Sequence, residues 1–110
     1  MQLTSYWEKD ARVISLAGQF KIEEWVVLEA ALLAAQLGQR KHVVLNLGQV
    51  SCSDRRILAK LFFAYVRLRQ QGIRLSLVNP QEWIRDVYER TNIPALVDYY
   101  GSDDEALGAI

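Results

Sequence analysis

Two apolar runs of strand length, separated by a helical pattern, restrict the fold of this chain more than any other feature. HVVLNLG at 42–48 is apolar almost throughout, and IRLSLV at 73–78 follows after a helical segment at 54–71. A strand that is apolar on both sides is typical of a parallel sheet with helices packed on it. The connection between such strands is a right-handed crossover through the intervening helix. The chain is therefore predicted to be an α/β protein.

The flanking segments extend this pattern in both directions. Residues 2–8 and 11–18 indicate a hairpin of two strands, and 23–38 a helix with acids in its first turn and a glycine at its end. Asn79 is the expected N-cap of a third helix that reaches about Thr91, with Pro80 in its first position and Glu82 completing a capping box. Residues 95–99 indicate a short edge strand, and a last helix is expected to begin at Ser102. The predicted architecture is one α/β domain over residues 1–110, with a four- to five-stranded, mostly parallel, mixed sheet and helices packed on it.

Composition excludes several classes of protein. The thirteen basic and thirteen acidic residues balance, so the chain lacks the basic field of a nucleic-acid-binding protein. One cysteine and one histidine provide neither a disulfide nor a Cys/His zinc site, and they fit a reducing compartment. The N-terminus lacks a signal-peptide pattern, and Glu29 interrupts the apolar stretch at 25–35. We expect a cytoplasmic protein without direct membrane insertion, and no cofactor or metal.

Catalysis has little support in the sequence. Neither a P-loop nor a GxGxxG motif occurs, so nucleotide binding is not indicated. His42 opens the predicted strand at 42–48 and Cys52 follows the other end of that strand, roughly 20 Å away at about 3.3 Å per residue, which rules out a nucleophile–base pair. No spacing brings two acidic residues onto one helix face near the strand ends. We therefore expect a protein that is not an enzyme.

Five motifs in order resemble the STAS domains of bacterial anti-sigma factor antagonists. They are VISLAGQFKIEE, the strand HVVLNLG, the turn QVSCSDRR with its helix, the strand–helix segment SLVNPQEW, and SDDEAL near the C-terminus. Together they cover nearly the whole chain. The resemblance implies a module that binds regulatory proteins, commonly switched by phosphorylation of a Ser or Thr directly before a motif glycine.

The phosphorylation motif departs from that pattern. Asp54 matches the motif aspartate, but Arg55 and Arg56 stand where the hydroxyl residues are usual, and Ile57 replaces the glycine. Lys21 stands where the first motif often has an aspartate. No phosphorylation is therefore expected at the motif position. Ser51 and Ser53 are nearby hydroxyls and weak candidates, more typical of turn and cap residues.

A helical projection of 54–71 separates two sides. Ile57, Leu58, Leu61, Tyr65 and Leu68 form an apolar stripe for the core. The opposite side carries an aromatic residue among cations, which is the composition of an interface centre. We name the predicted binding residues the docking face: Lys21, Ser53, Asp54, Arg55, Arg56, Lys60, Phe63 and Arg67. Two plainer readings stay open: the arginines point into solvent without a role, or C-terminal residues cover Phe63.

The leading hypothesis is a non-catalytic protein–protein interaction module of bacterial signal transduction and transcription regulation. Its expected partner is a regulatory protein such as an anti-sigma factor or kinase-like ATPase. The alternative partner is the ATPase subunit of a membrane transporter, for example a lipid-transport complex. A small-ligand or lipid-binding module ranks lower, and a homodimer remains open.

Overall fold

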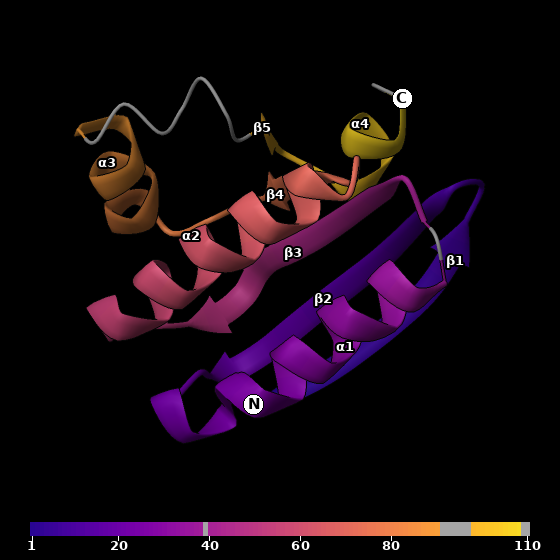
Figure 1. Cartoon of the computed structure of the whole chain (residues 1–110). Coiled ribbons are helices and arrows are strands. Elements are labelled where there is room, and N and C mark those ends of the chain that lie inside the picture. The colour runs from indigo at the N-terminus through magenta and orange to yellow at the C-terminus, as the bar shows by residue number, and fades with distance from the viewer. Residues whose placement is uncertain (39, 91–97, 109–110) are drawn as a thin grey trace.

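The computed structural model describes residues 1–38, 40–90 and 98–108 (Figure 1). Five strands and four α-helices follow one another, with a 3-10 turn before the first α-helix. In chain order they are β1 Gln2–Glu8, β2 Ala11–Gln19, η1 Ile22–Glu24, α1 Trp25–Leu37, β3 His42–Ser51, α2 Arg55–Gln70, β4 Arg74–Val78, α3 Glu82–Arg90, β5 Asp98–Tyr100 and α4 Asp103–Gly108. The predicted order of elements is confirmed.

The sheet is mixed and keeps the chain order, β1-β2-β3-β4-β5. β1 and β2 form the antiparallel hairpin, and β2, β3, β4 and β5 are parallel to one another. The edge strand predicted at 95–99 is β5, which begins at Asp98, and residues 95–97 lie outside the described residues. This arrangement confirms the predicted single-domain α/β fold with a five-stranded sheet.

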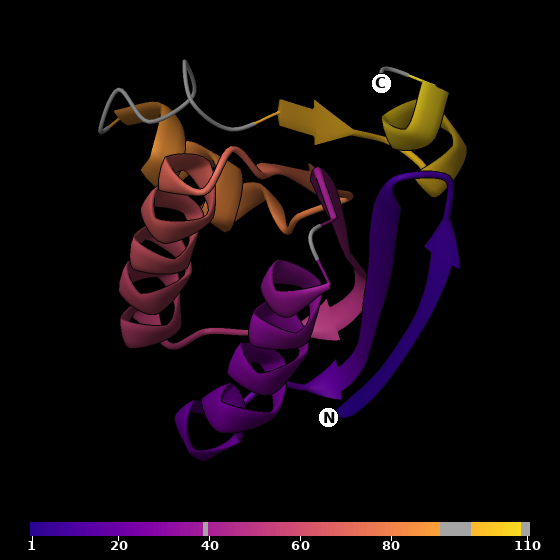
Figure 2. The same ribbon diagram turned by 45° about the vertical axis from the view of Figure 1, so that its right-hand side comes forward.

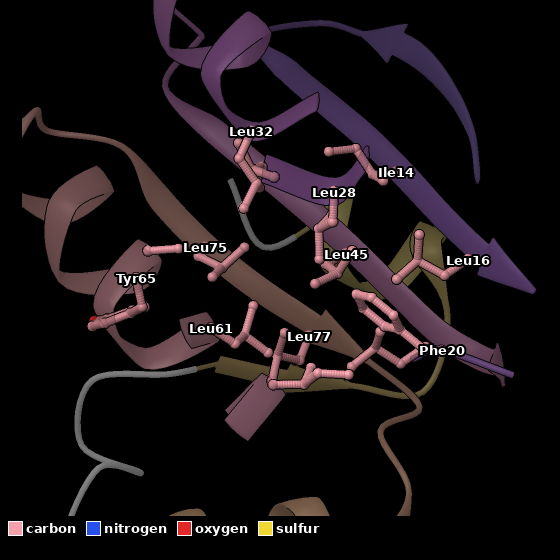
Figure 3. Packing of buried hydrophobic residues seen from close by; sticks show 14 of the residues in the cluster. Ile14, Leu16, Phe20, Leu28, Leu32, Leu45, Leu61, Tyr65, Leu75 and Leu77 are labelled. Carbon is pink, nitrogen blue, oxygen red and sulfur yellow. The ribbon is translucent and has the colours of Figure 1, made fainter. Parts of the chain in front are cut away.

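Helices cover the two faces of the sheet unequally. Leu28 and Leu32 of α1 and Leu61 of α2 pack over one face (Figure 3). Ile84 of α3 is buried in the same cluster. The short helix α4 lies on the other face (Figure 2). Its Ala106 and Leu107 belong to a smaller cluster of buried residues. β3 is buried on both sides, as its continuous apolar sequence predicts, with Leu45 in the large cluster and Val44 in the small one.

Helix α2 ends at Gln70, one residue before the predicted end at 71. Gly72 has φ +76°, a left-handed conformation that favours glycine. The Gly72 amide donates to the Arg69 carbonyl and the Ile73 amide to the Leu68 carbonyl, both at 2.9 Å. These two bonds are those of a Schellman motif, which satisfies the last carbonyls of the helix and turns the chain into β4.

The predicted start of the third helix is wrong. Asn79 has a left-handed backbone, φ +50°, and its amide donates to the Tyr100 carbonyl. Its side chain donates to the Gly101 carbonyl at 2.8 Å and so binds the end of β5 rather than the helix. α3 begins at Glu82, after Gln81, whose carbonyl accepts from the Ile84 amide. Tertiary hydrogen bonds to β5 thus override the local capping signal.

Membrane crossing is not indicated in the described part of the chain. Across residues 1–38, 40–90 and 98–108, no helix combines the length and the apolar character that spanning a bilayer requires.

Candidate docking surface

The carboxyl ends of three parallel strands meet at one edge of the sheet. The Phe20 amide, just after β2, donates to the carbonyl of Ser51, the last residue of β3, at 2.7 Å. The Cys52 amide donates to the Gln81 side-chain oxygen at 2.8 Å, which joins the turn after β3 to the start of α3. The loops after β2, β3 and β4 therefore form one surface, as expected for this edge of a parallel sheet.

Asp54 fixes the beginning of α2 at this edge. It has an extended backbone, and its side chain accepts a hydrogen bond of 2.9 Å from the Arg56 amide. That geometry is an N-cap, which satisfies a helix amide that has no partner within the helix. Cys52 beside it is buried and packs into the core, so the turn is anchored on the inside and exposed at Ser53.

The carboxylate of Asp54 also binds the guanidinium of Arg56. Nη2 of Arg56 lies 2.6 Å from Oδ2 of Asp54, and Nε lies 3.0 Å from Oδ1. The hydrogen bond from the Arg56 side chain lowers the pKa of Asp54, and the same bond raises the pKa of Arg56. An anion at a helix N-terminus is favourable and a cation is not, so this pair explains how Arg56 is accommodated there.

The outward side of α2 carries an exposed aromatic ring. Phe63 is 69% exposed, so the reading in which the chain's own C-terminal residues cover it is wrong. Arg56 and Lys60 are exposed on the same side, and Ile57 and Leu61 of the opposite stripe are buried, as the helical projection predicts. The Phe63 ring lies 5.9 Å from that of Phe62. The orientation of Phe63 is confirmed, and its binding role stays a prediction.

Arg67 takes a position different from the other cations of the docking face. It is half-buried between the two long helices, and its Nη1 donates to Oε1 of Glu29 in α1 at 3.1 Å. Figure 2 shows α1 and α2 side by side on one face of the sheet. Arg67 therefore links the two helices, and the cation that it adds to the docking face is partly neutralised.

The remaining residues of the docking face lie around the same edge. Lys21 is exposed at the start of η1, next to the end of β2, and Arg55 is exposed in the first turn of α2. Among the residues whose positions are described, no carboxylate pairs with Lys21, Arg55 or Lys60. The surface consequently keeps a net positive charge although Arg56 and Arg67 have acidic partners.

The two hydroxyls of the turn are accessible. Ser51 ends β3 and Ser53 precedes the N-cap, and both are exposed. Neither caps α2, because Asp54 does so. Exposure leaves both as weak candidates for modification.

Cys52 and His42 are not brought together. They lie at opposite ends of β3, and His42 is buried with its Nε2 2.7 Å from the Ser76 hydroxyl. Burial raises the pKa of the Cys52 thiol, which favours the unreactive protonated form at neutral pH. In the described part of the chain no cluster of metal-ligating side chains occurs.

An exposed apolar side of α1 was not anticipated from the sequence. The prediction gave 23–38 as a helix and did not say which of its sides is buried, and in the structure Val26 and Leu37 are 69% and 82% exposed. The signal was present: residues 25–37 contain a single charged residue, Glu29, so the helix is apolar on more sides than one sheet can cover.

Several solved structures have a fold similar to that of this chain. The Thermotoga maritima protein TM1081 superposes with a TM-score of 0.84 at 18% identity, covering 98% of this chain and 93% of that one. The phosphorylated form of the Bacillus cell fate determinant SpoIIAA gives 0.80 at 16% identity, covering 98% of each chain. An anti-sigma factor antagonist from Mycobacterium paratuberculosis gives 0.80 at 20% identity, covering 99% of this chain and 92% of that one. At these identities the structures establish a shared fold.

No curated protein matches the chain. The model of the family described as "Mlab, STAS domain" matches residues 4–98, which is most of the chain. With the five-stranded mixed sheet and the motif order in agreement, the chain belongs to this family of STAS domains.

Proposed function

We propose that this chain is a non-catalytic interaction module of the cytoplasm that binds a regulatory protein through the docking face. The observation that carries the proposal is the exposed ring of Phe63 on the same side of α2 as Arg56 and Lys60. Aromatic and arginine side chains dominate the energetics of protein interfaces, and a surrounding ring of polar groups excludes water from them. The docking face has both an exposed aromatic ring with an arginine beside it and polar side chains around them.

A positive partner-binding surface favours an acidic partner. Lys21, Arg55 and Lys60 are exposed cations around one sheet edge. Such a cluster steers association with an acidic surface and makes the association rate depend on salt. We propose an anti-sigma factor or a kinase-like ATPase with an acidic patch as the partner, and the ATPase subunit of a transporter as the alternative.

The interaction is proposed to be independent of phosphorylation at the motif position. A phosphoserine would add about −1.5 to −2 charges at the helix start. Here Arg55 and Arg56 occupy those positions, and Asp54 already provides the anion that caps α2 and pairs with Arg56. The turn therefore holds a permanent ion pair where relatives with hydroxyl residues can gain a reversible charge.

Among the described residues, the apolar cavity in the core gives no support for binding of a small ligand or lipid. An apolar cavity of about 20 Å³ lies between Phe20, Trp25 and Cys52, under the docking face. That volume holds about one water molecule and is far below what a lipid chain or metabolite requires.

The test is calorimetric titration of the purified chain with ATPases and anti-sigma factors encoded beside its gene. For the true partner, Phe63→Ala is expected to raise Kd by roughly 10- to 100-fold, and Arg56→Glu by a similar factor. Tyr6→Ala is the matched control, because Tyr6 is an exposed aromatic residue on β1, outside the docking face. Equal affinity of wild type and Phe63→Ala for a partner that binds tightly would exclude the docking face.

A further inference from the structure

Helix α1 presents an uninterrupted apolar surface to solvent. All of its exposed side chains are apolar, and we name them the α1 stripe: Val26, Val27, Ala30, Leu33, Ala34 and Leu37. Val26 and Leu37 are 69% and 82% exposed. The residues that α1 buries, among them Leu28 and Leu32, lie on its other side against the sheet (Figure 3). α1 is thus apolar on a side that no residue of the described segments 1–38, 40–90 and 98–108 covers.

The spacing of the stripe matches that of two packed helices. Val26, Ala30, Leu33 and Leu37 are separated by four, three and four residues, which keeps them on one line along the helix. Ala30 and Ala34 are small and allow a second helix to approach closely. The line runs the full length of α1, from its first turn to its last residue.

The charges at the two ends of α1 are complementary to each other. Glu23 is exposed just before the helix, whereas half-buried Arg40 and exposed Lys41 follow its end. When two α1 helices pack antiparallel about a two-fold axis, the acidic end of each meets the basic end of the other, and the helix dipoles are also opposed. In this register Val26 lies opposite the second copy's Leu37, and Ala30 opposite the second copy's Leu33.

We propose that the α1 stripe is a homodimer interface, and that its occupant is the antiparallel α1 of a second copy of this chain. This inference is independent of the function proposed for the docking face.

The size of the stripe indicates a weak dimer. Its four larger side chains expose roughly 400 Å², so two copies with their alanines bury about 1,000 Å², the lower bound for a specific interface. An apolar patch of this size on a monomer is commonly an interaction site. We therefore expect a reversible dimer with a dissociation constant in the micromolar range.

A lipid surface is a poorer occupant for the stripe. Helices that lie on membranes carry Lys and Arg beside their apolar side, which bind anionic headgroups. α1 has one ionisable residue, Glu29, which is acidic and paired with Arg67. A symmetric protein contact, in which each copy provides the same surface, requires no such cations.

Sedimentation equilibrium over protein concentrations from about 1 µM to about 500 µM tests the proposal. The wild type is expected to change from monomer to dimer within this range. Leu33→Glu places a charge at the centre of the contact and is expected to raise the dissociation constant on the order of 100-fold, about tenfold for each copy. Leu33 is 41% exposed, so circular dichroism is expected to show an unchanged fold. Gln70→Glu, on an exposed site of α2, is the matched control and is expected to dimerise as the wild type does.

Charge reversal tests the antiparallel register. Glu23→Lys and Lys41→Glu are each expected to weaken the dimer, and the two together to restore most of the loss. A chain that remains monomeric at every concentration would overturn the proposal, as would a Leu33→Glu protein that dimerises normally. If the double variant loses as much dimer affinity as the two single variants together, the antiparallel register is excluded. Cosedimentation of a monomeric wild type with phosphatidylglycerol vesicles would assign the stripe to lipid instead.

Discussion

His42 is expected to make the stability of the protein depend on pH between 5.5 and 7.5. Its imidazole is 2% exposed, and Nε2 lies 2.7 Å from the hydroxyl of Ser76, itself fully buried. Burial, and second the nearby Arg74 cation, lower the pKa of His42, while Asp98 opposes this shift. A folded-state pKa below the unfolded value near 6.5 means that the unfolded chain binds more protons as the pH falls. The stability from His42 is therefore complete above about pH 7.5 and decreases as the pH falls through the unfolded pKa.

The size of the effect has a clear upper bound. If the folded imidazole takes up no proton down to pH 5.5, the free energy of unfolding falls by about 1.4 kcal/mol between pH 7.5 and pH 5.5. The assay is urea unfolding at closely spaced pH values, which gives the slope of stability against pH. The chain has one histidine, so His42→Gln removes the imidazole titration and provides the reference profile. Subtracting the His42→Gln profile from the wild-type profile removes the contributions of the other titrating groups to the pH dependence of stability.

Two results would refute this reasoning. Profiles of wild type and His42→Gln that run parallel would mean that the folded and unfolded imidazoles bind protons alike. A wild type that gains stability relative to His42→Gln as the pH falls would mean that Asp98 outweighs burial and Arg74, which reverses the sign.

Three further predictions concern the turn, the thiol and the helix pair. Incubation with ATP and a kinase-like ATPase that binds the chain is expected to leave residues 51–57 without phosphate, and stoichiometric phosphoserine at Ser51 or Ser53 by mass spectrometry would contradict this. Because burial raises the pKa of Cys52, its thiol is expected to react with Ellman's reagent at least tenfold more slowly in the native protein than in urea; equal rates would show that Cys52 is accessible. A double-mutant cycle with Arg67→Met and Glu29→Gln is expected to give a coupling of about 0.5 kcal/mol in urea unfolding, since both side chains are partly exposed and solvent screens the pair; no coupling would show that the pair does not join α1 to α2.

Several elements were predictable from short stretches of sequence. β3 is a continuous apolar run, and such a run is stable only where both faces of a strand are covered. Gly72 ends α2 because a left-handed residue costs little only at glycine. The helical projection of α2 placed Phe63 outward, since the helix period alone decides which residues share a side.

Other features depended on residues far away in the sequence. The capping signal at Asn79 failed because Tyr100 and Gly101 accept its hydrogen bonds. From the sequence, Arg67 was placed on the docking face without a named partner, and the structure shows that Glu29, thirty-eight residues away, binds its guanidinium. The partners of Asn79 and of Arg67 could not be predicted from sequence spacing. Both sets of contacts form only after the sheet has brought distant segments together.

The sequence by itself determined the α/β class, the order of the elements, the buried side of α2 and the family resemblance. These follow from the period of apolar residues and from local backbone sterics, which act within a few neighbours along the chain. Only the tertiary structure decided that α1 keeps an apolar stripe in solvent and that Arg67 serves as a link between helices. Exposure and pairing depend on which segments come to lie against one another, and that is a property of the whole packed chain rather than of any stretch within it.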